Sequence, residues 1–364
     1  MPTFFIILIT AYLGGNTYVF YRGAQALSEL PIGIKAPLAI LFWLGTLSFF
    51  GSMLSRNVKM PSFISHSMYE IGTGWLIFTL YMVLFLLLFD ILRLLHAPFN
   101  YGFSFSLLFT LVLLGYGYYK YRHPKTNVIS LNLNKQYTGA QQSLKIVAIS
   151  DIHLGNGTGK TALKRYVKMI NGQKPDLILI GGDLIDNSVV PLYAENMQEE
   201  LSELKAPLGI YMIAGNHEYI SGIDKSIRFI RSTPIQLLRD SVVTLPNGIQ
   251  LIGRDDRSKH SRRSLQELMV NVDKDKPIIL LDHQPYGLAE SEAAGIDLQF
   301  SGHTHRGQVW PMSLVTDYIF EQSHGYRRWG NSHIYVSSGL SLWGPPFRIG
   351  TESEMVVFQL SMTK

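Results

Sequence analysis

The stretch Leu144–His153 reads LKIVAISDIH, and it decides how the second half of this chain folds. Its short apolar run predicts a β-strand that is buried on both faces. The polar residues Asp151 and His153 follow where that strand ends. Because ligand-binding groups in open α/β folds lie just beyond the carboxyl ends of strands, we expect these two side chains to belong to a functional site.

The same arrangement recurs four more times along the chain. An apolar run precedes each of four further clusters, which are Gly182-Asp183, Gly215-Asn216-His217-Glu218, Asp282-His283 and Gly302-His303-Thr304-His305. One such coincidence carries little weight. Five of them within one domain predict side chains that converge at the ends of neighbouring strands.

The clusters are rich in oxygen and imidazole groups, and the chain contains no cysteine. These groups suit Mn²⁺, Fe or Zn²⁺, and thiolate ligands and cysteine nucleophiles are excluded. Seven potential ligands are too many for one tetrahedral ion and fit two ions that share a carboxylate. The seven are Asp151, His153, Asp183, Asn216, His283, His303 and His305. We expect two divalent metal ions, Mn²⁺ first, with Fe or Zn²⁺ as alternatives.

The second half of the chain alternates strands and helices at first and is then dominated by strands. Strands are predicted at 144–150, 176–180, 209–214, 249–252, 277–281, 298–300, 333–336 and 355–360. Helices are predicted at 161–171, 194–204 and 262–270. This order predicts an α/β domain over residues 144–364, built as two packed sheets flanked by helices, an αββα sandwich-like architecture.

The first 122 residues are predicted to form a transmembrane helical region. Four apolar stretches are at or near the roughly 20 residues that span a bilayer as helix. They cover residues 4–20, 36–54, 75–95 and 103–119. The first is the weakest, because Gly14, Gly15 and Asn16 interrupt it. The polar residues 123–143 are predicted to be a linker.

Two other interpretations of the apolar stretches fit less well. A cleaved signal peptide lacks a basic segment before Phe4, and three more apolar spans follow it. A buried soluble bundle is also disfavoured, because soluble helices carry a polar face and these stretches are apolar all round. The sequence therefore indicates a multi-pass protein of the inner membrane.

The charge distribution bears on topology and partners. Residues 1–122 carry seven Lys/Arg and three acids, so most of the net charge of +5 lies beside the spans. With four spans, one side collects Arg56, Lys59, Lys120, Arg122 and Lys125, and the other collects Arg22, Lys35 and Arg93. This bias favours a cytoplasmic catalytic domain. No basic stripe with interleaved aromatics appears in the second half, so we expect no nucleic-acid partner.

The ordered set D-x-H, G-D, G-N-H-[DE], H and G-H-x-H resembles the calcineurin-like metallophosphoesterase superfamily. The resemblance covers roughly residues 144–360, and the segments GHTHRGQVWP and SSGLSLWGPPFRIG are similar to its bacterial membrane-associated branch. It implies that Asp151, His153 and His305 bind one metal, that Asn216, His283 and His303 bind the second, and that Asp183 bridges both.

Other residues are expected to have catalytic or substrate-binding roles, and Arg306 stands where the family branch usually has a small residue. His217 is the expected general acid, and either Asp186 or Glu218 is expected to orient it. Arg306 and Arg348 are candidates to hold a phosphate oxygen, and Trp343 is a candidate apolar wall. In the loop after the strand at 249–252, Asp255 and Asp256 are expected to be solvated.

The predicted function is that of a membrane-anchored phosphoesterase with two metal ions. We expect it to cleave a phosphoester or pyrophosphate bond in a lipid-linked or cell-envelope substrate, because an enzyme for soluble nucleotides gains little from four spans. Two alternatives stay open: a phosphodiesterase on soluble substrates whose helices are only an anchor, and a membrane sensor or transporter with a regulatory metal domain. The sequence indicates no oligomeric state.

Overall fold

The computed structural model describes residues 2–55, 61–96, 99–133, 135 and 143–362. The chain divides into two compact units. The helical unit comprises residues 1–119 and 344–349, and the catalytic unit comprises residues 120–343 and 350–364. The segment Gly344–Ile349 therefore leaves the catalytic unit, packs with the helices, and returns.

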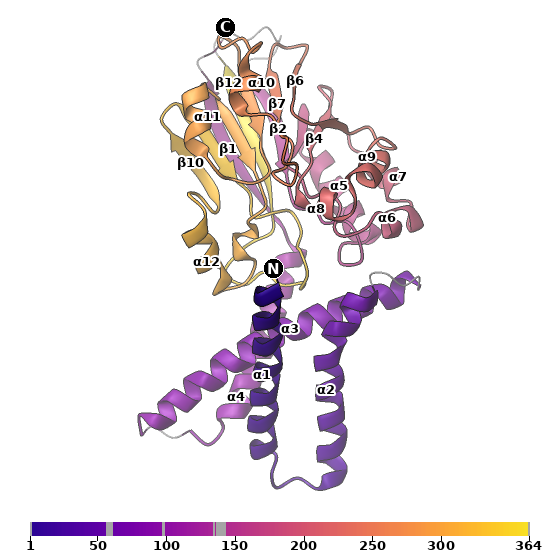
Figure 1. The fold of residues 1–364 in the computed structure, drawn as a ribbon, viewed down its shortest axis with the longest axis vertical. Helices are drawn as coiled ribbons and strands as arrows, with labels where there is room; N and C mark the ends of the chain where they lie inside the picture. Colours follow the sequence, from indigo (N-terminus) through magenta and orange to yellow (C-terminus); the bar gives the residue numbers. More distant parts are fainter. Residues whose placement is uncertain (1, 56–60, 97–98, 134, 136–142, 363–364) are drawn as a thin grey trace. The chain divides into compact units, whose positions relative to one another are not determined.

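The helical unit contains four long helices (Figure 1). They are α1 (Pro2–Ala26), α2 (Ile32–Ser55), α3 (Ser62–Leu94) and α4 (Gly102–Arg122). Three segments within the described residues are long and apolar enough to cross a membrane: Ile32–Met53, Phe63–Leu94 and Gly102–Arg122. The first predicted span forms a helix but does not reach that threshold, so a fourth crossing stays a prediction. Arg56 and Lys59, used for the topology, lie outside the described residues.

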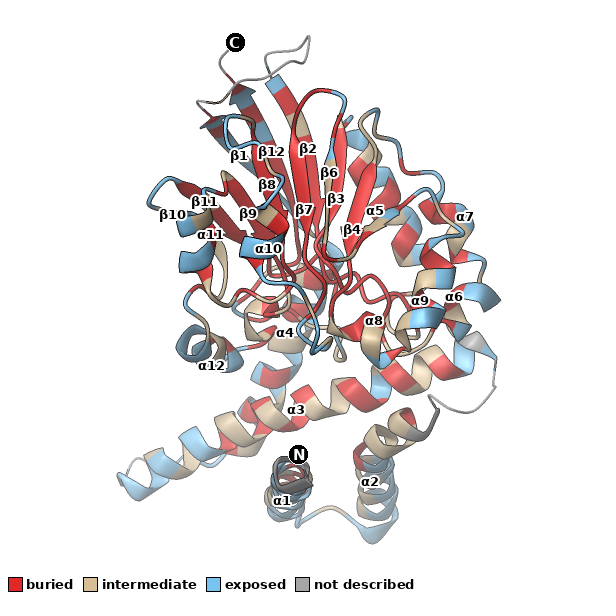
Figure 2. Cartoon of the chain, turned by 45° about the horizontal axis from the view of Figure 1, so that its top comes forward, coloured by how far each residue is buried: buried red, intermediate tan, exposed pale blue. Residues whose placement is uncertain are grey.

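Large apolar side chains are exposed along all four helices (Figure 2). Examples are Ile7 on α1, Leu41 on α2, Ile91 on α3 and Val112 on α4, each more than half exposed. A water-soluble helix would carry polar groups on its exposed face. These surfaces instead suit the hydrocarbon of a bilayer.

Asn16 is the centre of a buried polar contact between three helices. Its Oδ1 accepts hydrogen bonds from Thr46 Oγ1 (2.9 Å), Trp75 Nε1 (2.9 Å) and Thr79 Oγ1 (3.1 Å). Its Nδ2 donates to the Tyr12 carbonyl at 2.9 Å. The polar residue that weakens α1 as an apolar span thus joins α1 to α2 and α3, since interhelical hydrogen bonds hold helices together in lipid.

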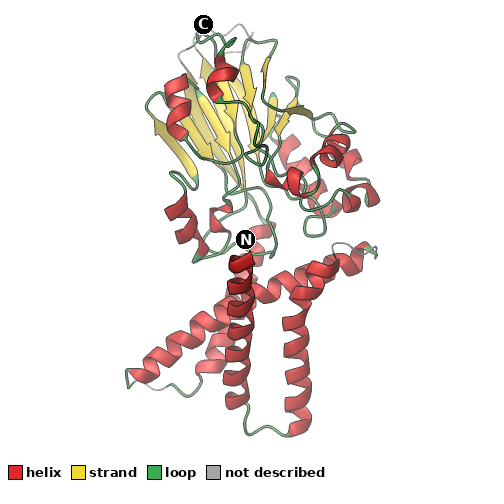
Figure 3. Ribbon diagram, in the orientation of Figure 1, coloured by secondary structure: helices red, strands yellow, loops and turns green. Residues whose placement is uncertain are grey.

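The catalytic unit contains two six-stranded sheets (Figure 3). The first has the order β1-β12-β2-β3-β4-β5, and the second has the order β10-β11-β9-β8-β7-β6. The first sheet consists of β1 (Lys125–Leu133), β12 (Glu354–Met362), β2 (Ser143–Ile149), β3 (Leu177–Ile180), β4 (Ile210–Ile213) and β5 (Gln236–Leu238). The second consists of β10 (Gly325–Trp329), β11 (Ser332–Val336), β9 (Leu298–Ser301), β8 (Ile278–Leu281), β7 (Gln250–Gly253) and β6 (Ser241–Thr244).

The two sheets pack face to face around one apolar core. Ile146, Leu179 and Phe358 of the first sheet share this core with Leu251 and Phe300 of the second, and all five are fully buried. The central strands β2, β3, β4, β7, β8 and β9 are buried along most of their length (Figure 2). The core explains the continuous apolar runs in the sequence, because these strands are covered on both faces.

Helices cover the outer faces of the sheets. The outer core of the first sheet includes residues of α5 (Lys160–Gly172), α6 (Val190–Ala194), α7 (Met197–Leu201) and α9 (Ile223–Ile230). The outer core of the second includes α10 (Leu265–Met269) and lies near α11 (Leu288–Ala294). The remaining helices are α8 (Asn216–Ile220), the 3₁₀ turn η1 (His305–Gly307) and α12 (Met312–Ile319). The α/β domain predicted from the sequence is confirmed.

The predicted linker is wrong over Lys125–Leu133, which forms strand β1 of the first sheet. β1 pairs in parallel with β12 along its whole length and buries Leu131 and Leu133 against the inter-sheet core. Its sequence is polar because an edge strand exposes much of its surface. The catalytic unit therefore begins near residue 120 and not at 144. Residues 136–142 of the predicted linker lie outside the described part of the chain.

Candidate metal centre

The predicted ligands gather at one edge of the two sheets. In the first sheet, β2, β3 and β4 are parallel neighbours, and Asp151, Asp183 and Asn216 follow their carboxyl ends. In the second sheet, β8 and β9 are parallel neighbours, and His283 and His303 follow theirs. The sheet order thus brings together side chains that are more than 150 residues apart in sequence.

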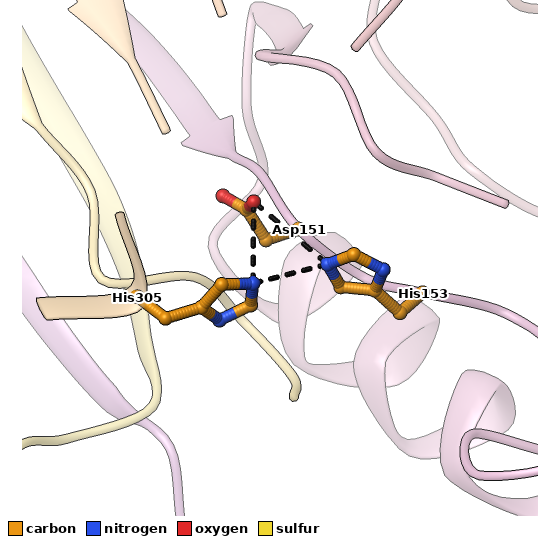
Figure 4. Close-up of side chains that lie close together, drawn as sticks. All are labelled: Asp151, His153 and His305. Carbon is orange, nitrogen blue, oxygen red and sulfur yellow. Dashed lines mark hydrogen bonds and ion pairs between the residues drawn. The ribbon is translucent and has the colours of Figure 1, made fainter. Parts of the chain in front are cut away.

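Asp151, His153 and His305 form the first group of ligand atoms (Figure 4). His153 Nε2 lies 3.0 Å from His305 Nε2, and His305 Nε2 lies 3.5 Å from Asp151 Oδ1. His153 Nε2 lies 3.9 Å from the same carboxylate oxygen. All three residues are buried. Two nitrogens bound about 2.1 Å from one ion would lie at a similar separation, so the group fits a single cation.

Asp183, His283 and His303 form a second group, and Asn216 lies against it. His283 Nε2 lies 3.1 Å from Asp183 Oδ2. His303 Nδ1 lies 2.9 Å from Asn216 Oδ1, so the amide oxygen points toward the imidazole. The structure therefore brings together all seven residues that the sequence predicted as ligands.

Asp183 lies between the two groups. Its Oδ2 is 3.1 Å from His283 Nε2 and 3.8 Å from His153 Nε2. Its Oδ1 accepts a hydrogen bond from the backbone N–H of His217 at 2.9 Å, which fixes the carboxylate in place. This one carboxylate can therefore reach ions in both groups.

The backbone at the site is held in the left-handed region. Asp151, His153, Asp183, His303 and His305 all have positive φ, between 47° and 74°. Non-glycine residues rarely adopt this conformation, and it persists where the surrounding structure imposes it, most often at functional sites. The turn after each strand thus aims its ligand at the shared centre.

Two glycines allow the loops to approach closely. A Cβ on Gly215 would collide with the carboxylate of Asp183, and a Cβ on Gly302 would collide with that of Asp151. Each glycine directly precedes a predicted ligand. The first glycine of the G-N-H-[DE] motif and that of the G-H-x-H motif are therefore required, because a side chain at either position would have no room.

Hydrogen bonds with neighbouring groups fix the orientation of the candidate ligands. His283 Nδ1 lies 2.7 Å from the Gly181 carbonyl, so this nitrogen donates and leaves Nε2 for the site. Glu218 accepts hydrogen bonds from the backbone N–H groups of Asp183 (3.0 Å), Ile185 (2.9 Å) and Gly215 (2.7 Å). The sequence predicted Glu218 as one of two candidates to orient His217. Its carboxylate instead connects the loop that carries Asp183 to the loop that carries Asn216.

Asp186 is the carboxylate that faces His217. Its Oδ1 lies 3.2 Å from His217 Nδ1 and 3.6 Å from His153 Nδ1. Burial lowers the pKa of His217, but Asp186 outweighs burial and raises the pKa to about 9. Burial raises the pKa of Asp186, and its contacts with His153 and His217 lower it to about 2. Because Nδ1 faces Asp186, Nε2 is the atom left to face a substrate.

The charges of the second group fit a divalent cation. Burial lowers the pKa of His283, yet the nearby Asp183 carboxylate raises it well above the usual value. His283 Nε2 is buried and has no hydrogen-bond partner within the described residues. A bound cation would stabilise this arrangement, because the Asp183 carboxylate and the unprotonated Nε2 of His283 can both coordinate it. The clusters of Asp and His fit divalent metals.

The three predicted substrate-binding residues are placed differently. The Trp343 ring lies 6.2 Å from the His217 ring, centroid to centroid, and is half exposed. Arg306 lies partly buried beside His305 and has a φ of 47°. Arg348 is completely buried, and its backbone N–H donates to the Gly117 carbonyl of α4. Arg348 belongs to the helical unit, so its role in substrate binding stays a prediction.

Comparison with known proteins identifies the family of this chain. The model of the calcineurin-like phosphoesterase family matches residues 144–307. A metallophosphoesterase from Helicobacter pylori is 34% identical over 262 residues, which cover 69% of each chain. One from Aquifex aeolicus is 30% identical over 69% of this chain and 97% of its own. The chain belongs to the calcineurin-like metallophosphoesterases. It is a metal-dependent phosphoesterase, a hydrolase that acts on ester bonds.

Two further relatives describe the range of the similarity. A zebrafish protein called a transmembrane protein with metallophosphoesterase domain is 30% identical over 69% of this chain and 60% of its own. Among solved structures, a 5′-nucleotidase precursor from Thermus thermophilus covers 60% of this chain and 55% of its own, at 14% identity and a TM-score of 0.37. The bacterial relatives are consistent with the predicted bacterial branch.

Proposed function

We propose that this protein is a membrane-anchored phosphoesterase that uses two divalent cations, Mn²⁺ first, to cleave a phosphoester or pyrophosphate bond in a lipid-linked or cell-envelope substrate. The position of Asp183 is the observation that supports two cations most directly. It lies between a group of Asp151, His153 and His305 and a group of Asn216, His283 and His303. The first group would hold one ion, the second group the other, and Asp183 would reach both.

The chemistry follows from the negative charge on phosphate. Two bound cations neutralise the phosphate oxygens and supply a water nucleophile at neutral pH. The carboxylates of Asp151 and Asp183 are held in fixed orientations. The backbone N–H of His303 donates a hydrogen bond to Asp151, and that of His217 donates one to Asp183. The strained turns hold these groups before substrate arrives, so little reorganisation is needed during the reaction.

His217 is proposed to hold the proton that the leaving oxygen takes. Its Nδ1 is engaged by the Oδ1 and the carbonyl of Asp186, both at 3.2 Å, so Nε2 carries the proton toward the substrate. Asp186 is proposed to orient the ring. Trp343, stacked edge to face with His217, is proposed to form an apolar wall beside the leaving group.

The membrane assignment is supported by the helical unit. Four helices of 21 to 33 residues carry exposed apolar side chains, and three of them are long and apolar enough to span a bilayer. We propose that all four cross the inner membrane and that the catalytic unit lies on the cytoplasmic side. An anchor held at the bilayer would keep the enzyme beside substrates that have lipid tails.

The substrate class can be tested with detergent-solubilised full-length protein and added Mn²⁺. Phosphate release would be measured from a long-chain lipid phosphate, its water-soluble short-chain analogue and a soluble aryl phosphodiester. The proposal predicts a higher kcat/KM for the long-chain lipid than for its short-chain analogue. Equal values for the two would show that the helices serve only as an anchor, and no turnover of any of the three would contradict the assigned chemistry.

A further inference from the structure

A cleft lined by basic side chains lies in the loop that follows β7. It has a volume of about 470 Å³. Its lining, here called the arginine cleft, consists of Arg254, Arg257, Lys259, His260, Arg262, Arg263, Ser264 and Glu267. Five of these eight residues are permanently cationic, and Glu267 is the one acid among them.

The buried carboxylate of Asp282 holds two arginines of the cleft in place. Asp282 is buried, and one of its oxygens lies 3.0 Å from Arg254 Nη1 while the other lies 3.1 Å from Arg262 Nη1. One carboxylate thus orients two guanidinium groups. Arg254 Nη1 also lies 3.8 Å from Glu290 Oε2, and Lys259 Nζ lies 2.8 Å from Asp240 Oδ2. Asp255 and Asp256, predicted to be solvated, are also buried. Arginines fixed in this way lose little freedom when an anion binds.

Arg254 carries a donor that needs an acceptor. The residue is only 7% exposed, and its Nε has no hydrogen-bond partner within the part of the chain that the structure describes. A buried donor left unpaired costs free energy, and charged donors cost more than neutral ones. An anion in the cleft would supply the acceptor.

The cleft adjoins the metal centre. β7 and β8 are parallel neighbours, so Arg254 and Asp282 follow adjacent strand ends, and the ligand His283 is next in sequence. A series of aromatic ring contacts also leads from the cleft to the metal centre. The guanidinium of Arg257 lies 4.8 Å from the Tyr286 ring, Tyr286 lies 4.9 Å from Phe320, and Phe320 lies 6.0 Å from His303.

We propose that the arginine cleft binds a phosphate group at a second site beside the metal centre. Guanidinium groups match phosphate because two parallel N–H groups can bind two of its oxygens. The phosphate comes either from a substrate that carries a second phosphate or from a separate phosphate ligand. The first source rests on the proposed function, whereas the existence of the site does not.

Binding of inorganic pyrophosphate to metal-free full-length protein, measured by calorimetry in the presence of a chelator, tests the site itself. The test variant is Arg257→Gln/Arg263→Gln, because both side chains are exposed and their replacement leaves the core intact. The matched control is Arg228→Gln/Arg231→Gln, which removes the same charge from exposed positions at α9. We expect the test variant to bind at least about tenfold more weakly than wild type and the control to bind like wild type. Equal affinity in all three proteins would overturn the proposal.

A second measurement identifies the source of the phosphate. With Mn²⁺ present, KM would be compared for p-nitrophenyl phosphate, which has one phosphate, and for glucose 1,6-bisphosphate, which has two. If the cleft holds a second phosphate of the substrate, the test variant raises KM for the bisphosphate about tenfold more than for the monophosphate. A pyrophosphate defect with an unchanged KM ratio assigns the site to a separate ligand. Normal pyrophosphate binding together with no hydrolysis would support the cleft and contradict the proposed function.

Discussion

Asp183 is the residue on which the two groups of ligands depend. We predict that Asp183→Asn lowers the rate more than about a hundredfold and reduces bound metal in both groups, because the amide removes the negative charge next to His153 and His283. Metal per chain by mass spectrometry and the rate on an aryl phosphodiester would be measured together. His305→Ala is the matched variant, since it removes a ligand of the first group alone and should cost less. Two retained metals and a near-normal rate in Asp183→Asn would contradict the assignment.

Replacement of His217 can distinguish a role in proton donation from a role in metal binding. We predict that His217→Ala keeps both metals and slows esters with poor leaving groups by about 10²–10⁴-fold. An activated aryl leaving group departs without a proton, so its hydrolysis should fall much less. Steady-state rates on an alkyl and a nitrophenyl ester, with metal content as the control, check this. Similar losses on both esters would indicate that His217 positions substrate or metal.

The convergence of the seven candidate ligands could be predicted from the sequence because each of them lies just after an apolar strand. Their neighbours could not be read in this way. Glu218 bonds to backbone groups of two loops that meet only in the folded chain. The arginine cleft was missed because Asp282, which orients two of its arginines, is 20 residues or more away from them in sequence. Arg348 was a candidate to hold a phosphate oxygen, and its sequence context gave no sign that the residue is buried.

At the scale of single elements, β1 decides where the catalytic unit can be cut. We predict that a fragment starting at residue 123 folds, whereas one starting at residue 144 is less stable and aggregates. The shorter fragment loses Leu131 and Leu133, each worth about 1.5–3 kcal/mol of burial, and exposes the edge of β12. Thermal unfolding and size-exclusion chromatography of the two fragments would be compared. Equal stability and equal solubility would show that β1 is dispensable.

The elements that the sequence predicted are the long and apolar ones. The central strands were found because burial on both faces leaves continuous apolar runs. β5 was missed because it is only three residues long, and β6 and β10 were missed because neither strand contains a fully buried residue. Of the predicted helix at 194–204, only α7 (Met197–Leu201) lies within the range, and α6 ends at Ala194, since the left-handed backbone of Asn196 separates the two helices.

At the scale of the whole molecule, the helical unit is predicted to affect substrate selection. The fragment from residue 123 should still hydrolyse small aryl phosphodiesters, because that chemistry needs only the metal centre. It should lose rate on lipid phosphates, since burial of an acyl chain is worth about 0.8 kcal/mol for each CH₂. The ratio of kcat/KM for the two substrates would be compared between fragment and full-length protein. An unchanged ratio would make the helices an anchor only.

Anomalous diffraction from crystals loaded with Mn²⁺ tests the central claim most directly, because it locates each ion without an assay. The account predicts two peaks at the carboxyl ends of the strands. One should lie among Asp151, His153 and His305 and the other among Asn216, His283 and His303, with the Asp183 carboxylate reaching both. A single peak under saturating Mn²⁺, or two peaks that Asp183 does not join, would contradict the two-metal assignment.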